Sequence, residues 1–458
     1  MATFTRRTLV DANATDVYQW HAQPGAIERL TPPWENVEVI STHGRFENRR
    51  VELLLRVGPF RRRWVARHVG CEVGRGFRDA QEKGPFRSWN HSHRFGPVDT
   101  GHTVLEDQIE YELPWGKVGR FVAGALVRDK LQRLFAYRHR VTCADLQALS
   151  MARRDGEVMN VLISGASGLV GSTLIPFLTA GGHRMRRLGR SRSRGADHVW
   201  DPASGTIDTD ALEGIDAIVH LAGENIGSRW TSAKKQEIRN SRVQSTRLLA
   251  ERLAAMSSPP RTLVCASAIG FYGEQGDERL DESSAAGSGF LAEVCRDWEA
   301  AAEPARRAGI RVVHLRFGIV LSPRGGPLAR MLPPFRMGGG GVIGGGKQYI
   351  SWIGIDDAIH VILRALTDES LEGPVNAVAP TPVTNAEFTR TLGKVLRRPT
   401  LVPLPAFVAR ALFGEMAEAT LLSSARVQPQ KLLDRGHSFQ HPQLEEALRH
   451  LLGRSDPT

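Results

Sequence analysis

The chain has 458 residues, of which 41% are hydrophobic, and it carries a formal net charge of +11. This length predicts two or three domains, each with a packed core of its own. The sequence contains no run of about 18 apolar residues, and no apolar stretch follows its first basic residues, so we expect neither a membrane span nor a secretory signal. We therefore expect a cytoplasmic protein.

The distribution of basic residues and of cysteines bears on nucleic-acid binding and on disulfide or zinc frameworks. Arginines are spread along the whole chain, and no helix-turn-helix, zinc finger or aromatic-basic module is visible, so we expect a solvated surface and no specific nucleic-acid partner. The four cysteines lie far apart and form no C-x-x-C pair, which indicates neither a disulfide framework nor a zinc cluster. These residues are Cys71, Cys143, Cys265 and Cys295.

The first 148 residues combine strand-like runs with helical stretches. Residues 3–10 alternate between apolar and polar side chains, which predicts a first strand. Asn13 or Thr15 then stands where it can cap a short helix. Five strand-like runs separated by Gly and Pro turns follow between residues 37 and 113. Apolar residues at three- and four-residue spacing then predict a long amphipathic helix over residues 117–138.

This order of elements resembles the helix-grip fold of the START/polyketide-cyclase-like (SRPBCC) superfamily. The specific likeness lies in DVYQWHAQPGAIERLTPPWENV and in ELPWG before the long helix. The resemblance implies a curved sheet wrapped around that helix and a hydrophobic small-molecule or lipid ligand. The alternative is a packed or interaction domain without a cavity.

A histidine pair lies in this N-terminal segment. Trp89, His91 and His93 fall on one face if residues 86–95 form a strand. No carboxylate or cysteine companion is evident, so we expect no metal site, and cavity lining or sheet surface is the simpler interpretation. Residues 149–157 are polar and are predicted to link this domain to the next.

Strands and helices alternate from residue 158, which predicts an α/β fold with a Rossmann-like doubly wound parallel sheet over residues 158–395. Its first strand ends in VLIS and is followed by a glycine turn and a helix. Small residues let the turn bend sharply and the backbone approach a pyrophosphate, while the N–H groups of the first helical turn face the phosphates. The predicted cofactor-binding residues here are Gly165, Ser167, Gly168, Leu169, Val170 and Gly171.

The G-x-x-G-x-x-G spacing resembles the extended, epimerase-like branch of the short-chain dehydrogenase/reductase superfamily. HLAGENIG after the fourth strand matches a nucleotide-lining motif of that superfamily. The resemblance therefore adds four cofactor-binding residues, Leu221, Ala222, Gly223 and, in LRFGIVLS, Arg316.

The end of the second strand predicts which dinucleotide binds. An NAD enzyme needs an acid about twenty residues past the glycines to accept from the ribose 2′-OH. The stretch RRLGRSRSRG offers Arg187, Arg190, Arg192 and Arg194 instead. Guanidinium groups bind a 2′-phosphate, so we predict NADP, with Arg190 as the best candidate and Arg192 next. The alternative is that these arginines form an exposed cluster that has no role in binding the cofactor.

The catalytic residues depart from the superfamily pattern. Ser267 matches its catalytic serine, but no tyrosine has a lysine four residues later, and Phe290 and Val294 stand where that pair belongs. Ser267 and Tyr272 are our first candidates for catalysis, and Tyr272 has the alternative role of a packing residue. Other candidates are Asp281, Glu282, Glu293 and Lys347, whereas Asp356 and Asp357 are expected to cap a helix.

Residues 158–450 resemble in particular the bacterial epimerase-family proteins of uncertain activity that are sometimes labelled cell-division-inhibitor-like. The likeness includes SAIGFYG, DWE, SWIGIDDA, GPVNAVAP and a small C-terminal domain over residues 396–452. The resemblance to the superfamily, together with the arginine cluster, leads us to expect an NADP-dependent oxidoreductase or epimerase acting on a small-molecule substrate. The missing tyrosine–lysine pair leaves an alternative, an NADP-binding sensor or adaptor with a lipid- or polyketide-like ligand in its N-terminal domain. The oligomeric state is left open.

Overall fold

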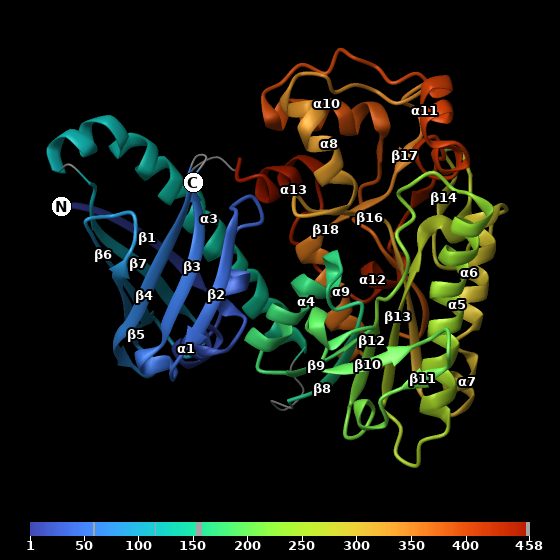
Figure 1. Ribbon diagram of the computed structural model, residues 1–458, viewed down its shortest axis with the longest axis horizontal. Coiled ribbons are helices and arrows are strands. Elements are labelled where there is room, and N and C mark those ends of the chain that lie inside the picture. Colours follow the sequence, from blue (N-terminus) through green and yellow to red (C-terminus); the bar gives the residue numbers. More distant parts are fainter. Residues whose placement is uncertain (58–59, 115, 153–157, 455–458) are drawn as a thin grey trace. The chain divides into compact units, whose positions relative to one another are not determined.

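The computed structural model describes residues 1–57, 60–114, 116–152 and 158–454. The chain divides into two compact units, which are described separately (Figure 1). The first comprises Met1–Met151 and two short later segments, and the second comprises Ala152–Ile175 and His183–Arg449.

The first unit is built on one antiparallel sheet of seven strands in the order β1-β7-β6-β5-β4-β3-β2. Because β1 pairs with β7 along its whole length, the first strand of the chain lies beside the last strand of the sheet. The strands are β1 (Ala2–Val10), β2 (Val37–His43), β3 (Arg50–Val57), β4 (Phe60–Glu72), β5 (Gly76–Lys83), β6 (Ser88–Pro97) and β7 (Thr103–Glu112).

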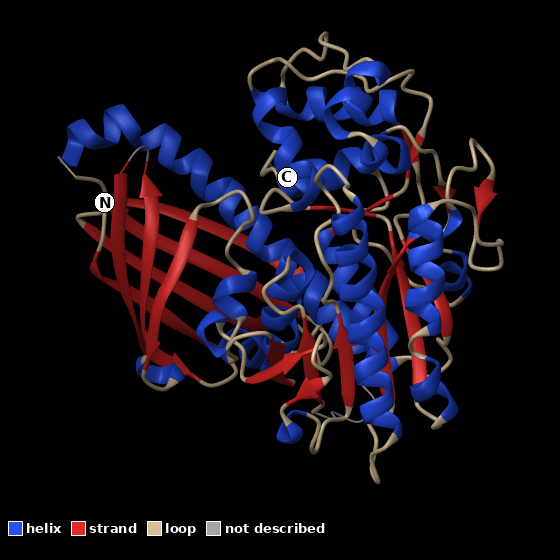
Figure 2. Cartoon of the chain, turned by 45° about the vertical axis from the view of Figure 1, so that its right-hand side comes forward, coloured by secondary structure: helices blue, strands red, loops and turns tan. Residues whose placement is uncertain are grey.

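Helices cover the concave face of this sheet. The short helices are α1 (Ala14–Ala22), α2 (Ala26–Arg29) and the 3-10 turn η1 (Phe46–Asn48). Asn13 caps α1 by accepting the Asp16 N–H at 2.9 Å. The long helix α3 (Gly116–Ala152) lies across the sheet (Figure 2). Its Leu131 and Phe135 pack against Trp89 and other apolar residues of β6 and β7. This is the expected helix-grip arrangement.

Helix α3 is longer than the sequence predicts. Val141, Leu146 and Leu149 are buried, so the apolar face continues past residue 138 and no stop signal interrupts it. The predicted linker over residues 149–157 is therefore wrong at its start, because α3 runs to Ala152. The rest of that linker, residues 153–157, lies outside the described residues.

The second unit is built on an eight-stranded sheet in the order β11-β10-β9-β8-β12-β13-β15-β19. All neighbouring pairs are parallel except β10 with β11. The strands are β8 (Asn160–Ser164), β9 (Arg184–Gly189), β10 (His198–Asp201), β11 (Thr206–Ile207), β12 (Ala217–His220), β13 (Thr262–Ala268), β15 (Arg311–Phe317) and β19 (Gly373–Ala377). The sequence predicts the other six strands, near residues 161–164, 183–188, 198–200, 217–221, 262–266 and 312–315, but not β11 and β19.

The order of the strands reverses at β8, because the chain moves outward to β9 and β10 and then returns to β12 on the other side of β8. Parallel sheets bind ligands outside the carboxyl ends of the strands at such a reversal. The helices that flank the sheet are α4 (Leu169–Ala180), α5 (Ser232–Ala254), α6 (Phe290–Ala300), α7 (Glu303–Arg307) and α9 (Ile355–Thr367). The sequence predicts one helix over residues 292–307, but the structure splits this stretch into α6 and α7, with Pro304 at the start of α7.

The other helices and strands of the second unit lie outside the eight-stranded sheet. The helices are α8 (Gly326–Arg336), α10 (Asn385–Leu396), α11 (Ala406–Phe413), α12 (Gln430–Asp434), α13 (Leu444–Leu451), η2 (Arg192–Arg194), η3 (Thr209–Ala211), η4 (Ile269–Tyr272) and η5 (Ala417–Leu421). The strands are β14 (Arg279–Leu280), β16 (Ile319–Leu321), β17 (Tyr349–Ile350), β18 (Trp352–Gly354), β20 (Val383–Thr384) and β21 (Arg426–Val427). Asp357 lies in the first turn of α9 and accepts the backbone N–H groups of Gln440 and His441.

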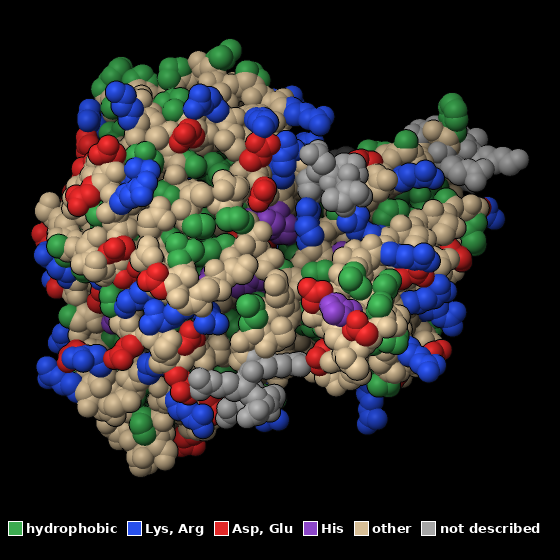
Figure 3. Space-filling view, turned by 180° about the vertical axis from the view of Figure 1, so that it is seen from behind, with side chains coloured by type: hydrophobic (Ala, Val, Ile, Leu, Met, Phe, Trp, Pro, Cys, Tyr) green, Lys and Arg blue, Asp and Glu red, His purple; other side chains and the backbone are tan. Residues whose placement is uncertain are grey.

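The surface agrees with the solvated distribution of charge that the sequence predicts. On the face that Figure 3 shows, Lys and Arg side chains are interspersed with Asp and Glu side chains. Within the described part of the chain, no helix has the length and apolar composition needed to cross a membrane.

Candidate dinucleotide site

The three glycines after β8 have different steric surroundings. Gly165 has φ +72°, and a Cβ on it would lie 2.7 Å from the Leu221 carbonyl carbon. A Cβ on Gly171 would lie 2.4 Å from the Gly165 oxygen. A Cβ on Gly168 would meet only the Gly165 oxygen within 4 Å, at 3.1 Å, so this position opens outward. Gly165 and Gly171 thus allow the turn to close, and Gly168 leaves its outer side clear.

The turn passes directly into α4. The Gly168 N–H donates to the Gly165 carbonyl at 2.9 Å, and the Ser172 N–H donates to the Gly168 carbonyl at 2.9 Å. Ser167 and Gly168 are exposed. The first N–H groups of a helix have no acceptor within the helix, so those of Leu169 and Val170 are oriented as donors for an anion at this end.

The segment after β12 forms the other side of the reversal point. The Leu221 N–H donates to the Ser164 carbonyl at 3.1 Å, which holds Leu221 and Ala222 against the glycine turn. Gly223 is exposed, and a Cβ on it would lie 3.3 Å from Cζ of Arg242. The predicted cofactor-binding residues of both segments therefore meet at the carboxyl ends of β8 and β12.

A row of buried hydrogen bonds lies beneath the carboxyl ends of β8 and β12. The Ser164 hydroxyl lies 2.5 Å from His220 Nδ1, and His220 Nε2 lies 3.1 Å from Ser245 Oγ. The Ser245 hydroxyl donates to the Ser241 carbonyl, so it accepts from Nε2–H of His220, and Nδ1 accepts from Ser164. Burial lowers the pKa of His220 to about 3, so this imidazole is neutral.

The arginine cluster after β9 separates into residues with different roles. Arg192 forms an ion pair with Asp208 at 2.9 Å and donates to the Asp197 carbonyl, so its guanidinium holds the loop together. Arg187 faces Asp197 at 3.7 Å. Arg190 is exposed, and within the described residues its side chain makes no hydrogen bond or ion pair. The side chain of Arg194 lies outside the described residues.

Ser267 belongs to a polar row that crosses the sheet. Ser267 on β13, Arg316 on β15 and Asn376 on β19 are neighbours in register. The Ser267 hydroxyl donates to Glu299 Oε1 of α6 at 2.7 Å, and Arg316 donates to both Glu299 oxygens at 2.8 Å. Burial opposes ionisation of Glu299, but Arg316 and the Ser267 hydroxyl outweigh it and lower the pKa of this carboxyl.

Tyr272 is part of the same network. Its hydroxyl donates to Asn376 Oδ1 at 2.7 Å and accepts from Arg316 Nη1 at 3.1 Å, and the side chain is fully buried. Burial raises the pKa of Tyr272 despite the nearby Arg316. This geometry argues against Tyr272 as a group that exchanges a proton with substrate and favours its alternative role as a packed tyrosine. Arg316 is 3% exposed, as Ser267 is, and its guanidinium is held by Glu299 and Tyr272. In this arrangement Arg316 serves the network and not the cofactor surface for which the sequence predicts it.

Phe290 and Val294 on α6 occupy the expected positions of the missing tyrosine–lysine pair. The Phe290 ring lies 5.2 Å from Trp230, and Lys235 Nζ lies 4.6 Å above it. Lys235 comes from α5 and also pairs with Glu415 at 2.8 Å. Sequence reasoning missed Lys235 and Glu299, although Glu299 belongs to the DWE motif that carries part of the family resemblance.

The other acid/base candidates do not join Ser267. Glu282 is buried and accepts the backbone N–H groups of Asn376 and Lys431, and burial raises its pKa. Asp281 accepts from Ser283 within its own turn. Glu293 and Lys347 are exposed.

Three family models match successive parts of the chain. Residues 10–135 match a family described as polyketide cyclase/dehydrase and lipid transport, residues 161–377 match the NAD dependent epimerase/dehydratase family, and residues 404–451 match a domain of unknown function. The first two agree with the helix-grip and Rossmann-like folds described above.

Comparisons with individual proteins agree with these matches. An epimerase family protein of Mycobacterium bovis is 44% identical over 290 residues, which cover 63% of this chain and 96% of that protein. The crystal structure of a nucleoside-diphosphate sugar epimerase from Corynebacterium glutamicum is 36% identical, with a TM-score of 0.80 and coverage of 98% of this chain and 90% of that one.

The crystal structure of the human epimerase family protein SDR39U1 with NADPH is also 36% identical, with a TM-score of 0.60. It covers 64% of this chain and 99% of that chain. The glycine turn at the reversal of a parallel sheet and these relatives together show that the chain belongs to the NAD(P)-binding epimerase family.

Proposed function

We propose that the second unit is an NADP-dependent oxidoreductase or epimerase that acts on a carbonyl or hydroxyl group of a small molecule. The observation that carries this proposal is Arg190, an exposed guanidinium at the end of β9 that forms no ion pair within the described residues. A ribose 2′-phosphate supplies the anion that such a group binds, whereas the 2′-OH of NAD does not. The human relative crystallised with NADPH supports the same choice.

The residues at the reversal point suit such a cofactor. The outward side of Gly168 accommodates a pyrophosphate that a Cβ would obstruct, and the first-turn N–H groups of α4 offer it hydrogen bonds. Leu221, Ala222 and Gly223 line the opposite wall. When bound, NADP supplies or accepts hydride.

Ser267 is the residue proposed to polarise the substrate oxygen. Its hydroxyl is held by Glu299, which is held in turn by Arg316, so both act as positioning residues. Ser267 is 3% exposed, so its hydroxyl reaches a substrate oxygen only if it turns from Glu299 and the surrounding side chains open. It then donates a hydrogen bond without the need for a tyrosine.

Arg190→Gln tests the cofactor assignment, with Arg184→Gln on the exposed start of the same strand as a matched control. We expect Arg190→Gln to weaken NADPH binding at least tenfold and to leave NADH binding unchanged, as measured by fluorescence titration. Arg184→Gln should change neither affinity. Equal or tighter binding of NADH by the wild-type chain contradicts the proposal.

A second function is favoured by Phe290, which stands in the tyrosine position and packs between Trp230 and Lys235. A site without the proton-transfer pair suits an NADP-dependent sensor or adaptor, with a hydrophobic ligand in the first unit as its polyketide-cyclase family match suggests. A screen of carbonyl and sugar substrates that follows NADPH absorbance separates the two. Turnover that is lost in Ser267→Ala supports the enzyme, and nucleotide binding without turnover supports the sensor.

A further inference from the structure

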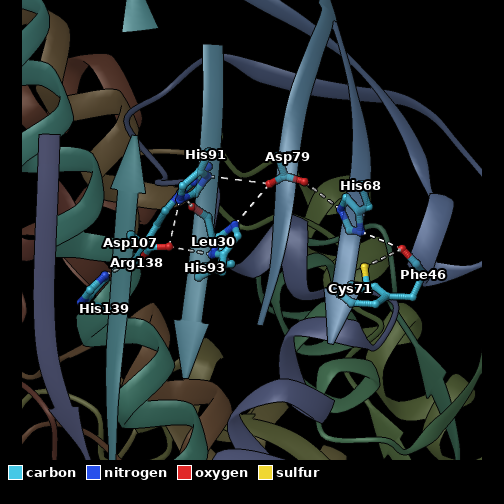
Figure 4. A network of polar contacts seen from close by, with 10 residues as sticks. All are labelled: Leu30, Phe46, His68, Cys71, Asp79, His91, His93, Asp107, Arg138 and His139. Carbon is cyan, nitrogen blue, oxygen red and sulfur yellow. Dashed lines mark hydrogen bonds and ion pairs between the residues drawn. The ribbon is translucent and has the colours of Figure 1, made fainter. Parts of the chain in front are cut away.

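Six ionisable side chains meet on the concave face of the first unit, at a distance in sequence from the glycine turn. They come from four neighbouring strands and α3, and Figure 4 shows them facing one another. They are His68 on β4, Asp79 on β5, His91 and His93 on β6, Asp107 on β7 and His139 on α3. We call this group the histidine–aspartate cluster. It corrects the sequence-based expectation that the histidine pair has no carboxylate companion.

Strand register explains how the cluster forms. Asp79 is the cross-strand partner of His91, and Asp107 is the cross-strand partner of His93. Side chains two residues apart on a strand share a face, so His91 and His93 lie between one carboxylate on each side. Both histidines are nearly completely buried, while the Asp79 side chain retains 21% exposure and offers a route from solvent.

Asp107 orients both imidazole rings. His91 Nε2 lies 2.9 Å from Asp107 Oδ1, and His93 Nδ1 lies 2.6 Å from the same oxygen. The other Asp107 oxygen lies 2.7 Å from His139 Nε2, which fixes the carboxylate from α3. A carboxylate that is hydrogen-bonded to the far nitrogen of a histidine, as Asp107 is to His91, is the usual outer support of a metal ligand.

The near nitrogens of both rings face Asp79. His93 Nε2 lies 3.2 Å and His91 Nδ1 lies 3.8 Å from Asp79 Oδ2. Because His91 donates its Nε2–H to Asp107, its neutral ring presents a lone pair at Nδ1 to a carboxylate oxygen. Two acceptors that face each other repel, and a cation held between them removes that repulsion.

The second oxygen of Asp79, Oδ1, lacks a hydrogen-bond donor among the described residues. This oxygen is buried and accepts no hydrogen bond. The nearest nitrogen of the cluster is His68 Nε2 at 3.1 Å, but His68 donates Nδ1–H to the Phe46 carbonyl at 2.9 Å. In the neutral imidazole Nε2 is then an acceptor as well, so a buried carboxylate oxygen again faces a lone pair.

We propose that Asp79, His91 and His93 bind one divalent transition-metal ion of the zinc type, oriented by Asp107. For a tetrahedral ion with bonds near 2.1 Å, ligand atoms lie about 3.4 Å apart, which falls between the 3.2 and 3.8 Å observed. Two imidazole nitrogens and one carboxylate oxygen suit zinc, iron or cobalt and not magnesium or calcium, which prefer all-oxygen sites. Three protein ligands leave a position for a further ligand.

One other group in the described residues has comparable spacing, His198 with Asp208 and Asp210. It contains a single histidine, and its Asp208 already accepts from Arg192 and from the Val199 N–H. It therefore serves as the internal control for non-specific metal binding.

The test uses the full chain, stripped of metal with a chelator and titrated with Zn²⁺ by calorimetry. We expect one ion per chain and a loss of at least tenfold in affinity in Asp79→Asn and in His93→Gln. His198→Asn and the exposed His102→Asn should retain wild-type affinity. Failure of the wild type to bind Zn²⁺, or loss of binding in His198→Asn alone, overturns the proposal.

A spectroscopic measurement on the wild-type chain keeps the test decisive if the cluster variants do not fold. Cu²⁺ added at one equivalent should give an electron paramagnetic resonance spectrum with superhyperfine coupling to two nitrogens, from His91 and His93. A spectrum with one coupled nitrogen or none assigns the metal elsewhere and overturns the proposal.

Discussion

The Ser267 hydroxyl of β13 donates to the Glu299 carboxylate of α6 at 2.7 Å, and that same carboxylate neutralises the buried Arg316. The serine expected to act on substrate is thus tied to a structural ion pair across 32 residues of sequence. Stability and reactivity are therefore coupled at this point.

Glu299→Gln should destabilise the second unit strongly. The substitution leaves the guanidinium of Arg316 buried without a countercharge, and breaking a buried pair in this way costs about 3 kcal/mol or more. Ser267→Ala removes one hydrogen bond and should cost about 1 kcal/mol. Denaturant unfolding of both variants measures the difference, and equal losses would show that the ion pair adds nothing.

Two glycine substitutions should separate folding from nucleotide binding. Gly171→Ala places a Cβ 2.4 Å from a backbone oxygen, so we expect a markedly lower melting temperature. Gly168→Ala meets one backbone atom at 3.1 Å and should change stability by less than about 1 kcal/mol. NADPH affinity should nevertheless fall at least tenfold in Gly168→Ala. Unchanged affinity in that variant would remove the proposed phosphate site.

Tyr272→Phe should affect stability more than turnover. The variant leaves the Asn376 oxygen and an Arg316 N–H without their buried partner, at a cost of about 1–3 kcal/mol. For any substrate that the wild type turns over, kcat at a temperature well below unfolding should stay within twofold. A hundredfold loss of kcat in a folded Tyr272→Phe protein would restore Tyr272 as a catalytic residue.

His220 should make stability depend on pH. Burial lowers the pKa of His220 to about 3, whereas the unfolded side chain keeps the ordinary histidine pKa of 6.5. The unfolded state therefore binds a proton below pH 6.5 that the folded state does not, and the free energy of unfolding falls as the pH falls from 6.5 toward 3. One proton corresponds to about 1.4 kcal/mol per pH unit.

His220→Asn removes this titrating group, with the exposed His43→Asn as its control. Urea unfolding at mildly acidic pH, between the two pKa values of His220, should show a shallower pH dependence for His220→Asn than for the wild type. His43→Asn should leave the slope close to that of the wild type. Identical slopes in His220→Asn and the wild type would mean that the buried imidazole takes up a proton in the folded state.

Local patterns allow much of the fold to be predicted. Apolar runs such as residues 161–163, the glycines that follow them and the cap at Asn13 act over a few residues, so their conformations can be deduced from neighbours in sequence. The sequence places the end of α3 too early because the buried Val141 and Leu149 extend its apolar face without a stop signal. The sequence ranks Arg190 ahead of Arg192, and the structure adds a physical reason, since Asp208 pairs with Arg192.

The sequence alone determined the two folds and the glycine turn, because alternation, glycine spacing and strand–helix order are read along the chain. The tertiary structure decided which side chains meet. Asp79 reaches His91, Asp107 reaches His93 and Glu299 reaches Ser267 through strand register and helix packing. These contacts depend on the pairing of distant segments, which residue types and local spacing do not specify.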